Sequence, residues 1–278
     1  MRLGAPVFVK TNDPQELAKA HTAEGYRAAY CPSVTLKEPE RIREIEKAFA
    51  AEGVIIAEVG AWGNMIAPDL QKRQAQINTV CERLALADEV GALGCVDYAG
   101  TYDPSSSTNP HPKNLSRECF DLIVATVRQI IDSVKPKRAR FMLEMMPAVY
   151  PNSPDSYAAL LKAVNRPEFG VHLDPVNIIT SPERYFYNGR VIKECFHKLG
   201  HAIVSCHGKD TIMRPTFMVE IQECRPGTGT LDYRTFLTEL NRLPGDIPLM
   251  LEHLPNKEEY ELAKGYITAV AAELGLSF

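Results

Sequence analysis

The sequence predicts one α/β domain, residues 1–278, folded as a single (β/α)8 TIM barrel. Short apolar runs of strand length alternate with amphipathic helical segments along the whole chain, and they make eight βα units. No linker, repeat or low-complexity tract interrupts this alternation. A doubly wound sheet is the main alternative, but it requires a glycine-rich phosphate loop after the first strand, and Lys10-Thr-Asn-Asp-Pro14 is not one.

The first half of the chain is expected to supply four strand–helix units. Asn12-Asp13-Pro14 has the cap and the proline that begin a helix, while Gly25, Gly53 and Gly91 follow helical segments as stops. The strands are expected at residues 3–9, 26–30, 54–59 and 95–98, and the helices at 15–24, before Gly53, at 68–90 and at 115–134. Residues 100–114 are too many for a minimal connection, so they predict a long loop on the face of the domain where the active site is expected.

The second half repeats the pattern with four more units. The strands are expected to hold Glu144 and to end at Asp174, His207 and Glu252. The helices are expected at residues 154–164, near 182–199, after 227–232 and from Asn256, with a long loop over 209–226.

Composition restricts the possible partners and the compartment. The formal net charge of −4 gives no general attraction for nucleic acid or for an anionic membrane. Seven cysteines without a CxxC pair are typical of a reducing cytosol. The first residues lack an apolar signal core, and no apolar run approaches the ~20 residues of a membrane span. We therefore expect a cytoplasmic protein without a nucleic acid or membrane partner.

Four consecutive predicted strands end on side chains that can bind a metal. These are Glu144, Asp174, His207 and Glu252. A buried carboxylate needs a compensating partner, and the carboxyl ends of barrel strands meet at one face. Three carboxylates and one imidazole suit a divalent cation, Mn²⁺ first, with Mg²⁺, Co²⁺ or Zn²⁺ as alternatives. The competing interpretation is that each of these residues is paired separately with backbone or with an arginine.

Two further motifs give the chain a family resemblance. Cys206-His-Gly-Lys-Asp210 is similar to a His-x-Lys-Asp strand end, and Arg225-Pro-Gly-Thr-Gly-Thr-Leu-Asp232 is similar to a Pro-Gly-x-Gly-x-x-Asp loop. With the ordered Glu, Asp, His, Glu set, the whole chain resembles the xylose isomerase-like superfamily of sugar isomerases and epimerases. The resemblance implies a metal-dependent isomerase or epimerase of a sugar or sugar phosphate that works through an enediolate. Glu144 and Glu252 would transfer protons, and Asp174 and His207 would serve as ligands.

Three positions depart from the ketose 3-epimerase pattern within that superfamily. Tyr150 stands where a second Glu is usual, Asn177 where a His is usual, and Met213 where an Arg is usual. These departures leave open a metal-dependent lyase or dehydratase that uses β-elimination on a keto-cyclitol or a 3-keto-glycoside, including C-glycoside cleavage.

Four other residues are candidate substrate contacts, each with a competing structural explanation. Trp62 would stack on a sugar ring or pack as a core or interface aromatic. His172 shares the facing of Asp174 and would line the pocket or be a satisfied core histidine. Asn177 would bind a hydroxyl or cap a helix, and Arg225 would bind a substrate oxygen or make a surface ion pair. We also expect Lys209 to pair with Asp210 in support of His207, and His253 to face away from Glu252.

Two other functions fit the sequence less well. A zinc-dependent abasic-site endonuclease shares this barrel, but it would need more histidines at the strand ends and a basic face. A sugar-binding module without chemistry would have no use for two intact glutamates at the strand ends. The expected partner is therefore a small-molecule sugar, with homo-oligomerisation through the outer helices.

Overall fold

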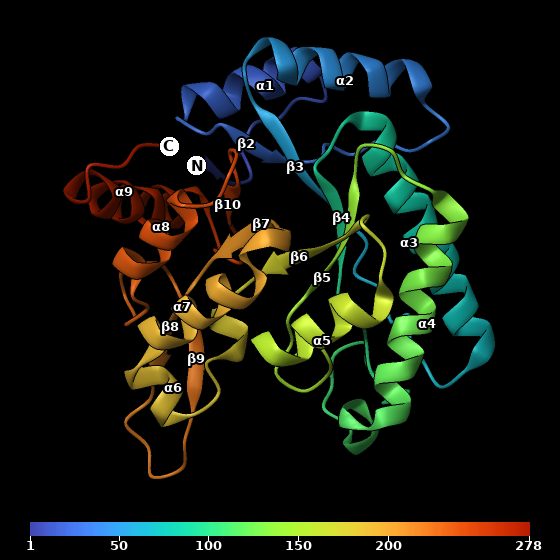
Figure 1. The fold of residues 1–278 in the computed structure, drawn as a ribbon. Helices are drawn as coiled ribbons and strands as arrows, with labels where there is room; N and C mark the ends of the chain where they lie inside the picture. The colour runs from blue at the N-terminus through green and yellow to red at the C-terminus, as the bar shows by residue number, and fades with distance from the viewer.

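Eight parallel strands close into a barrel in the computed structural model, which describes residues 1–278 (Figure 1). The order around the barrel is β1-β10-β7-β6-β5-β4-β3-β2. The strands are β1 (Arg2–Gly4), β2 (Ala28–Tyr30), β3 (Ile55–Gly60), β4 (Gly94–Asp97), β5 (Arg140–Glu144), β6 (Phe169–Leu173), β7 (Ile203–Gly208) and β10 (Pro248–Leu251). This closure confirms the predicted (β/α)8 architecture.

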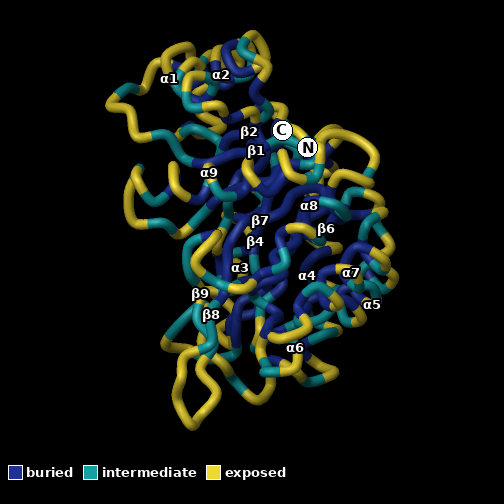
Figure 2. The backbone as a smooth tube through the Cα atoms, turned by 90° about the vertical axis from the view of Figure 1, so that its left-hand side faces the viewer, coloured by how far each residue is buried: buried dark blue, intermediate teal, exposed yellow.

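The helices lie on the outside of the barrel and bury one face each against it. They are α1 (Pro14–Ala23), α2 (Pro39–Ala51), α3 (Leu70–Val90), α4 (Arg117–Val134), α5 (Pro154–Val164), α6 (Pro182–Phe186), α7 (Asn188–Leu199), α8 (Tyr233–Asn241) and α9 (Lys257–Glu273). Figure 2 shows the buried backbone concentrated in the strands and the exposed backbone in outer loops and helix faces. None of the helices combines the length and the apolar character that crossing a bilayer requires.

Caps predicted from the sequence hold two of these helices. The Asp13 side chain accepts hydrogen bonds from the backbone N–H groups of Gln15 and Glu16, which begins α1. Asn256 accepts one from Glu259 at the start of α9. Helix α3 ends at Gly91, which adopts φ 75°, a left-handed conformation that favours glycine.

Three elements differ from the sequence-based expectation. Strand β1 ends at Gly4 rather than at residue 9, because Pro6 has no N–H to give to the sheet. The helix expected near 182–199 is divided into α6 and α7 at Tyr187, whose φ −117° and ψ 33° are not helical. The loop expected over 209–226 contains an antiparallel hairpin of β8 (Asp210–Met213) and β9 (Ile221–Cys224).

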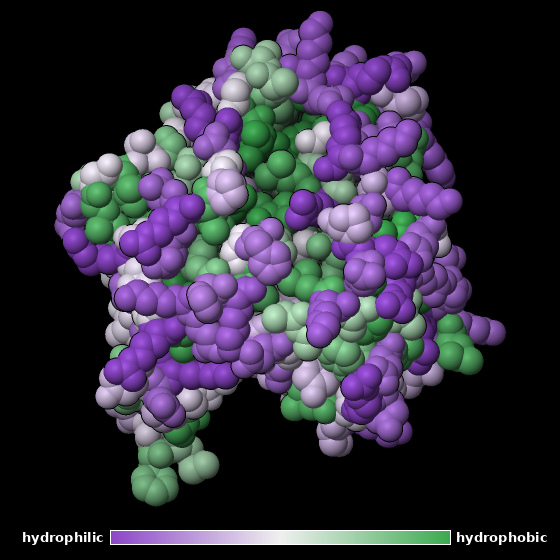
Figure 3. Space-filling view, in the orientation of Figure 1, coloured by the Kyte–Doolittle hydropathy of each residue, from purple (hydrophilic) through white to green (hydrophobic).

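The β8–β9 hairpin projects from the barrel, and its turn lies at the lower left of Figure 1. Phe217, Met218 and Val219 at this turn are exposed, and the projecting tip is green in Figure 3. Met213 lies opposite Ile221 near the turn, whereas Thr211 and Ile212 lie opposite the polar residues Glu223 and Gln222. Only Lys209 separates the hairpin from β7, and His207 lies at the end of β7.

Tyr157 of α5 joins β5 and β6 at their buried faces. Its fully buried hydroxyl lies 2.6 Å from the Leu143 carbonyl, 2.9 Å from that of Gly170 and 3.1 Å from the Leu143 N–H. We expect Tyr157→Phe to lower the free energy of unfolding by about 1–3 kcal/mol, since these backbone groups lose a partner without gaining water. Urea denaturation measures this, with Tyr187→Phe, at an exposed ring, as the control.

Candidate metal centre

The four predicted donors converge at the carboxyl ends of neighbouring strands. Strands β5, β6, β7 and β10 are consecutive in the barrel, and Asp174 and Glu252 follow β6 and β10 directly. His207 Nδ1 lies 2.8 Å from Glu252 Oε1, 3.0 Å from Glu144 Oε1 and 4.0 Å from Asp174 Oδ2. One donor atom from each residue lies within 4.8 Å of all the others. Residues far apart along the chain therefore form a single cluster.

The spacing of the donor atoms fits one divalent cation. Bonds of about 2.1 Å to an octahedral ion place neighbouring donors about 3.0 Å apart and opposite donors about 4.2 Å apart. The distances of 2.8, 3.0 and 4.0 Å from His207 Nδ1 match these two values. In addition, Asp174 Oδ2 and Glu252 Oε1 are buried and accept no hydrogen bond. Their close neighbours are the charged groups of His207 and Lys209, and buried carboxylate oxygens compensated mainly by charge suit a cation.

Lys209 provides a positive charge beside the cluster. Its ammonium lies 2.7 Å from Asp174 Oδ2, 2.9 Å from Glu252 Oε1 and 3.3 Å from Glu223 Oε2, and its side chain is only 3% exposed. The contacts to Asp174 and Glu252 are close ion pairs, so the ammonium compensates part of the negative charge of these two carboxylates. Lys209 follows β7 directly and lies two residues after His207.

The expected pairing of Lys209 with Asp210 is wrong. Asp210 faces the other way and accepts hydrogen bonds from four backbone N–H groups, those of Thr211, Gly227, Gly229 and Leu231. Gly229 has to be a glycine, since a Cβ there would lie 2.4 Å from Asp210 Oδ1. The Pro-Gly-x-Gly segment is thereby fixed against the base of the hairpin, and Asp210 supports the loop rather than the ammonium.

The buried charged groups shift one another's pKa values in the metal-free protein. Burial raises the pKa of Glu144, but the hydrogen bond and positive charge of His207 outweigh it and bring the pKa to about 2. Burial raises the pKa of Asp174 to about 6, against the opposing charge of Lys209. Burial lowers the pKa of His207, yet the carboxylates of Glu58 and Glu252 raise it well above its usual value. Without a cation, the His207 imidazolium itself neutralises part of the cluster.

One charged residue of the site was not singled out from the sequence. Glu58 of β3 lies across the barrel with Oε1 3.1 Å from His207 Nε2 and Oε2 3.3 Å from His172 Nδ1. Its side chain is 1% exposed. The sequence did contain a sign of it. Glu58 is the single charged residue in the apolar run 54–59, and the runs that supplied the donors have the same pattern.

Two of the predicted substrate contacts lie beside the donor cluster. The Trp62 ring centroid is 6.5 Å from that of His207, and the side chain is 42% exposed in the loop after β3. Its φ of 48° is unusual for a bulky residue. The Asn177 amide donates to Glu144 Oε1 at 3.2 Å and to the Met145 carbonyl at 3.1 Å. Asn177 does not cap a helix, since Ser181 caps α6.

The other two candidates, His172 and Arg225, lie under the cluster and at α9 respectively. His172 is fully buried beneath the cluster, with its ring centroid 4.0 Å from that of His207. Arg225 forms an ion pair with Glu259 of α9, at 2.8 Å. His172 Nδ1 lies 3.3 Å from Glu58 Oε2, but neither ring nitrogen makes a hydrogen bond. Substrate contact by either residue stays a prediction.

His253 does not face away from Glu252 as expected. Its Nε2 lies 3.5 Å from Glu252 Oε2, and its Nδ1 lies 3.2 Å from Glu223 Oε1. The reason is that β10 ends at Leu251 and His253 takes φ 58°, so strand alternation no longer determines where its side chain points.

Solved structures with this fold include a xylose isomerase-like TIM barrel protein from Mycobacterium smegmatis in complex with magnesium. The two share 17% identity over 93% of this chain and 88% of that one, with a TM-score of 0.66. D-psicose 3-epimerase from Clostridium cellulolyticum, solved with D-tagatose, gives 13% identity, 97% and 99% coverage and a TM-score of 0.69. Endonuclease IV from Thermus thermophilus gives 13% identity, 98% and 100% coverage and a TM-score of 0.72. At these identities the likeness is one of fold.

The family model for the xylose isomerase-like TIM barrel matches residues 17–270, which is most of the sequence. No curated protein matches the chain in sequence. The matched residues include all four members of the donor cluster, together with Glu58 and Lys209. The chain therefore belongs to the xylose isomerase-like TIM barrel family.

Proposed function

We propose that this protein is a divalent-metal-dependent isomerase or epimerase that moves a proton next to the carbonyl of a keto sugar. One observation carries the proposal. Within the donor cluster, only the two glutamates reach the surface, with Glu144 8% and Glu252 11% exposed, whereas Asp174 and His207 are 0% exposed. The two carboxylates that we assign to proton exchange are thus the less enclosed members of the cluster, and the other two donors are fully enclosed.

Each residue of the site has a separate role in this reaction. A cation held by the four donors would polarise a carbonyl and its neighbouring hydroxyl and so acidify the C–H bond between them. Either Glu144 or Glu252 removes that proton, and the other returns one from the opposite side, which inverts or relocates the centre. Asn177 orients Glu144 through its amide hydrogen bond, and Lys209 stabilises the negative charge of Glu252. The exposed face of Trp62 offers an apolar surface for the sugar ring.

The relatives support this choice of substrate and cofactor. The epimerase structure with D-tagatose has the same fold around a sugar, and the Mycobacterium smegmatis structure has it with magnesium. The donor chemistry favours Mn²⁺ first, with Mg²⁺ as the next candidate, since three carboxylates and one imidazole are hard to borderline ligands.

A proton NMR assay in D₂O tests the proposal. The protein is incubated with Mn²⁺, and in parallel with Mg²⁺, on a panel of keto sugars, their phosphates and 3-keto-glycosides, and EDTA and removal of the protein precede the spectra. We expect one hydrogen next to the carbonyl to be replaced by deuterium, and an epimer or isomer to accumulate. Absence of exchange and of turnover across the panel would overturn the proposal.

A lyase or dehydratase is the second candidate, and three side chains favour it. Where ketose 3-epimerases carry sugar-gripping residues, Tyr150 donates its hydroxyl proton to the Leu115 carbonyl, Asn177 lies against Glu144, and Met213 lies in the β8–β9 hairpin. The protein thus lacks some of the side chains that would be expected to bind a free ketose. In the same assay this candidate predicts release of water or of an aglycone instead of an epimer. Nicking of abasic DNA would point to endonuclease chemistry, which the net charge of −4 disfavours.

A further inference from the structure

We infer that Glu58 is a positioning residue that fixes the imidazole of His207 so that Nδ1 faces the cation. The inference rests on the proposed metal-dependent function and extends it to a residue outside the donor set. Glu58 lies on β3, and the donors come from the opposite side of the barrel, so the contact crosses the barrel interior.

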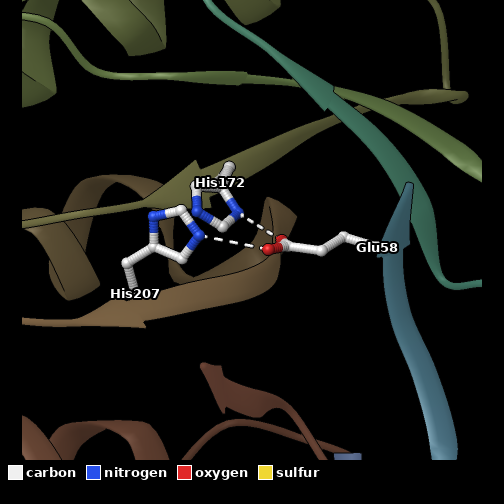
Figure 4. Close-up of side chains that lie close together, drawn as sticks. All are labelled: Glu58, His172 and His207. Carbon is white, nitrogen blue, oxygen red and sulfur yellow. Dashed lines mark hydrogen bonds and ion pairs between the residues drawn. The ribbon is translucent and has the colours of Figure 1, made fainter. Parts of the chain in front are cut away.

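The contacts of the Glu58 carboxylate are few and well defined (Figure 4). Oε1 lies 3.1 Å from His207 Nε2, and Oε2 lies 3.3 Å from His172 Nδ1. Ser205 Oγ donates to Oε2 at 3.2 Å. All four side chains are essentially without solvent, with Ser205 and both histidines at 0% and Glu58 at 1% exposure. Water therefore does not compete for these contacts.

The chemistry of the two rings and the carboxylate determines the proton's position. An ionised carboxylate only accepts hydrogen bonds, whereas a neutral imidazole has one N–H and one bare nitrogen. Carboxylates lie beside both nitrogens of His207, and a cation among the three donors on the Nδ1 side would require Nδ1 to be unprotonated, so the single hydrogen would lie on Nε2, where Glu58 accepts it. Nδ1 is the atom that lies 2.8–4.0 Å from the three carboxylate donors, which makes it the nitrogen that faces the cation. A carboxylate behind a histidine ligand fixes its tautomer and orientation and makes it a stronger donor.

The same three residues, Glu58, His172 and His207, also satisfy the spacing of a second metal site. The hydrogen-bond interpretation is favoured for two reasons. The 3.1 Å separation is an ordinary N–H···O distance, and the group is fully enclosed, which leaves no position for the water ligands that a three-donor site needs. A second cation would also require Nε2 to lose its hydrogen. Stoichiometry separates the two interpretations.

The test measures Mn²⁺ binding by isothermal titration calorimetry to wild type, Glu58→Ala, Glu58→Gln and Ser205→Ala. We expect one ion per chain, and an affinity about 10–100-fold lower in Glu58→Ala. Glu58→Gln retains an acceptor oxygen for Nε2–H and should recover most of the loss. Ser205→Ala removes a partner of Glu58 without touching His207, and should change the affinity by less than about threefold.

Nitrogen-15 NMR of the wild type with Mg²⁺ gives a second, independent reading. We expect His207 with the hydrogen on Nε2 and the cation on Nδ1, and we expect the Nε2–H resonance to move upfield in Glu58→Ala because the hydrogen bond to the carboxylate is lost. An Nε2–H resonance that is the same in both proteins would mean that Glu58 does not hold this hydrogen. The opposite tautomer, unchanged affinity in Glu58→Ala, or two ions per chain would overturn the role of Glu58. Failure of the wild type to bind any Mn²⁺ would instead overturn the proposed function itself.

Discussion

Replacing Glu144 or Glu252 by Gln should lower kcat by a factor of about 10²–10⁴ and leave the fold intact, because a glutamine cannot take or return a proton. Both side chains are largely buried but reach the open side of the cluster. Gln keeps the shape and one oxygen of each donor, so part of the cation affinity should survive. Steady-state kinetics at saturating Mn²⁺, together with circular dichroism, measures the effect.

The matched control is Glu168→Gln, the same substitution at the amino end of β6, on the opposite face of the barrel. It should leave kcat unchanged. Asp174→Asn is the second comparison. Asp174 is fully enclosed, so its replacement should mainly weaken cation binding, and excess metal should restore part of the activity. If both glutamine variants retain activity within about threefold of wild type, neither glutamate is the proton-transfer group.

Replacing Lys209 by Met should lower the free energy of unfolding of the metal-free protein by about 3–5 kcal/mol. The ammonium lies 2.7 Å from Asp174 Oδ2 and 2.9 Å from Glu252 Oε1, and only 3% of the side chain is exposed. Its removal leaves buried carboxylates facing one another with less positive charge between them. A divalent cation supplies that charge, so Mg²⁺ or Mn²⁺ should stabilise Lys209→Met more than it stabilises wild type.

Urea denaturation in EDTA and in Mg²⁺ measures both effects. Lys198→Met is the control, since Lys198 also contacts two carboxylates, Asp155 at 2.6 Å and Glu194 at 2.7 Å, but on the surface. There solvent and salt screen the charges, and the change should be small. Equal effects of the two substitutions would mean that Lys209 does not compensate the buried cluster.

The sequence was sufficient for the barrel and for the convergence of the donors, for a simple physical reason. Glu144, Asp174, His207 and Glu252 each end an apolar run, and in a parallel barrel all strand ends lie on one face. Strand period and topology therefore bring these side chains together without knowledge of any loop.

What the sequence did not predict depends on contacts across the barrel or on local backbone conformation. The facing of Glu58 toward His207 follows from barrel closure and register, which no single run reveals. His253 points back toward Glu252 because its φ is 58°, beyond the last residue of a strand. The hairpin of β8 and β9 was hidden among charged and proline residues, whose local preferences resemble those of a loop.

The most direct test is a crystal structure of the protein soaked in Mn²⁺, with anomalous diffraction used to locate the ion. We predict one peak per chain, within about 2.0–2.6 Å of His207 Nδ1 and of the carboxylates of Glu144, Asp174 and Glu252. No peak among these four donors, or a peak bonded to His207 Nε2 with Glu58 and His172, would contradict the account.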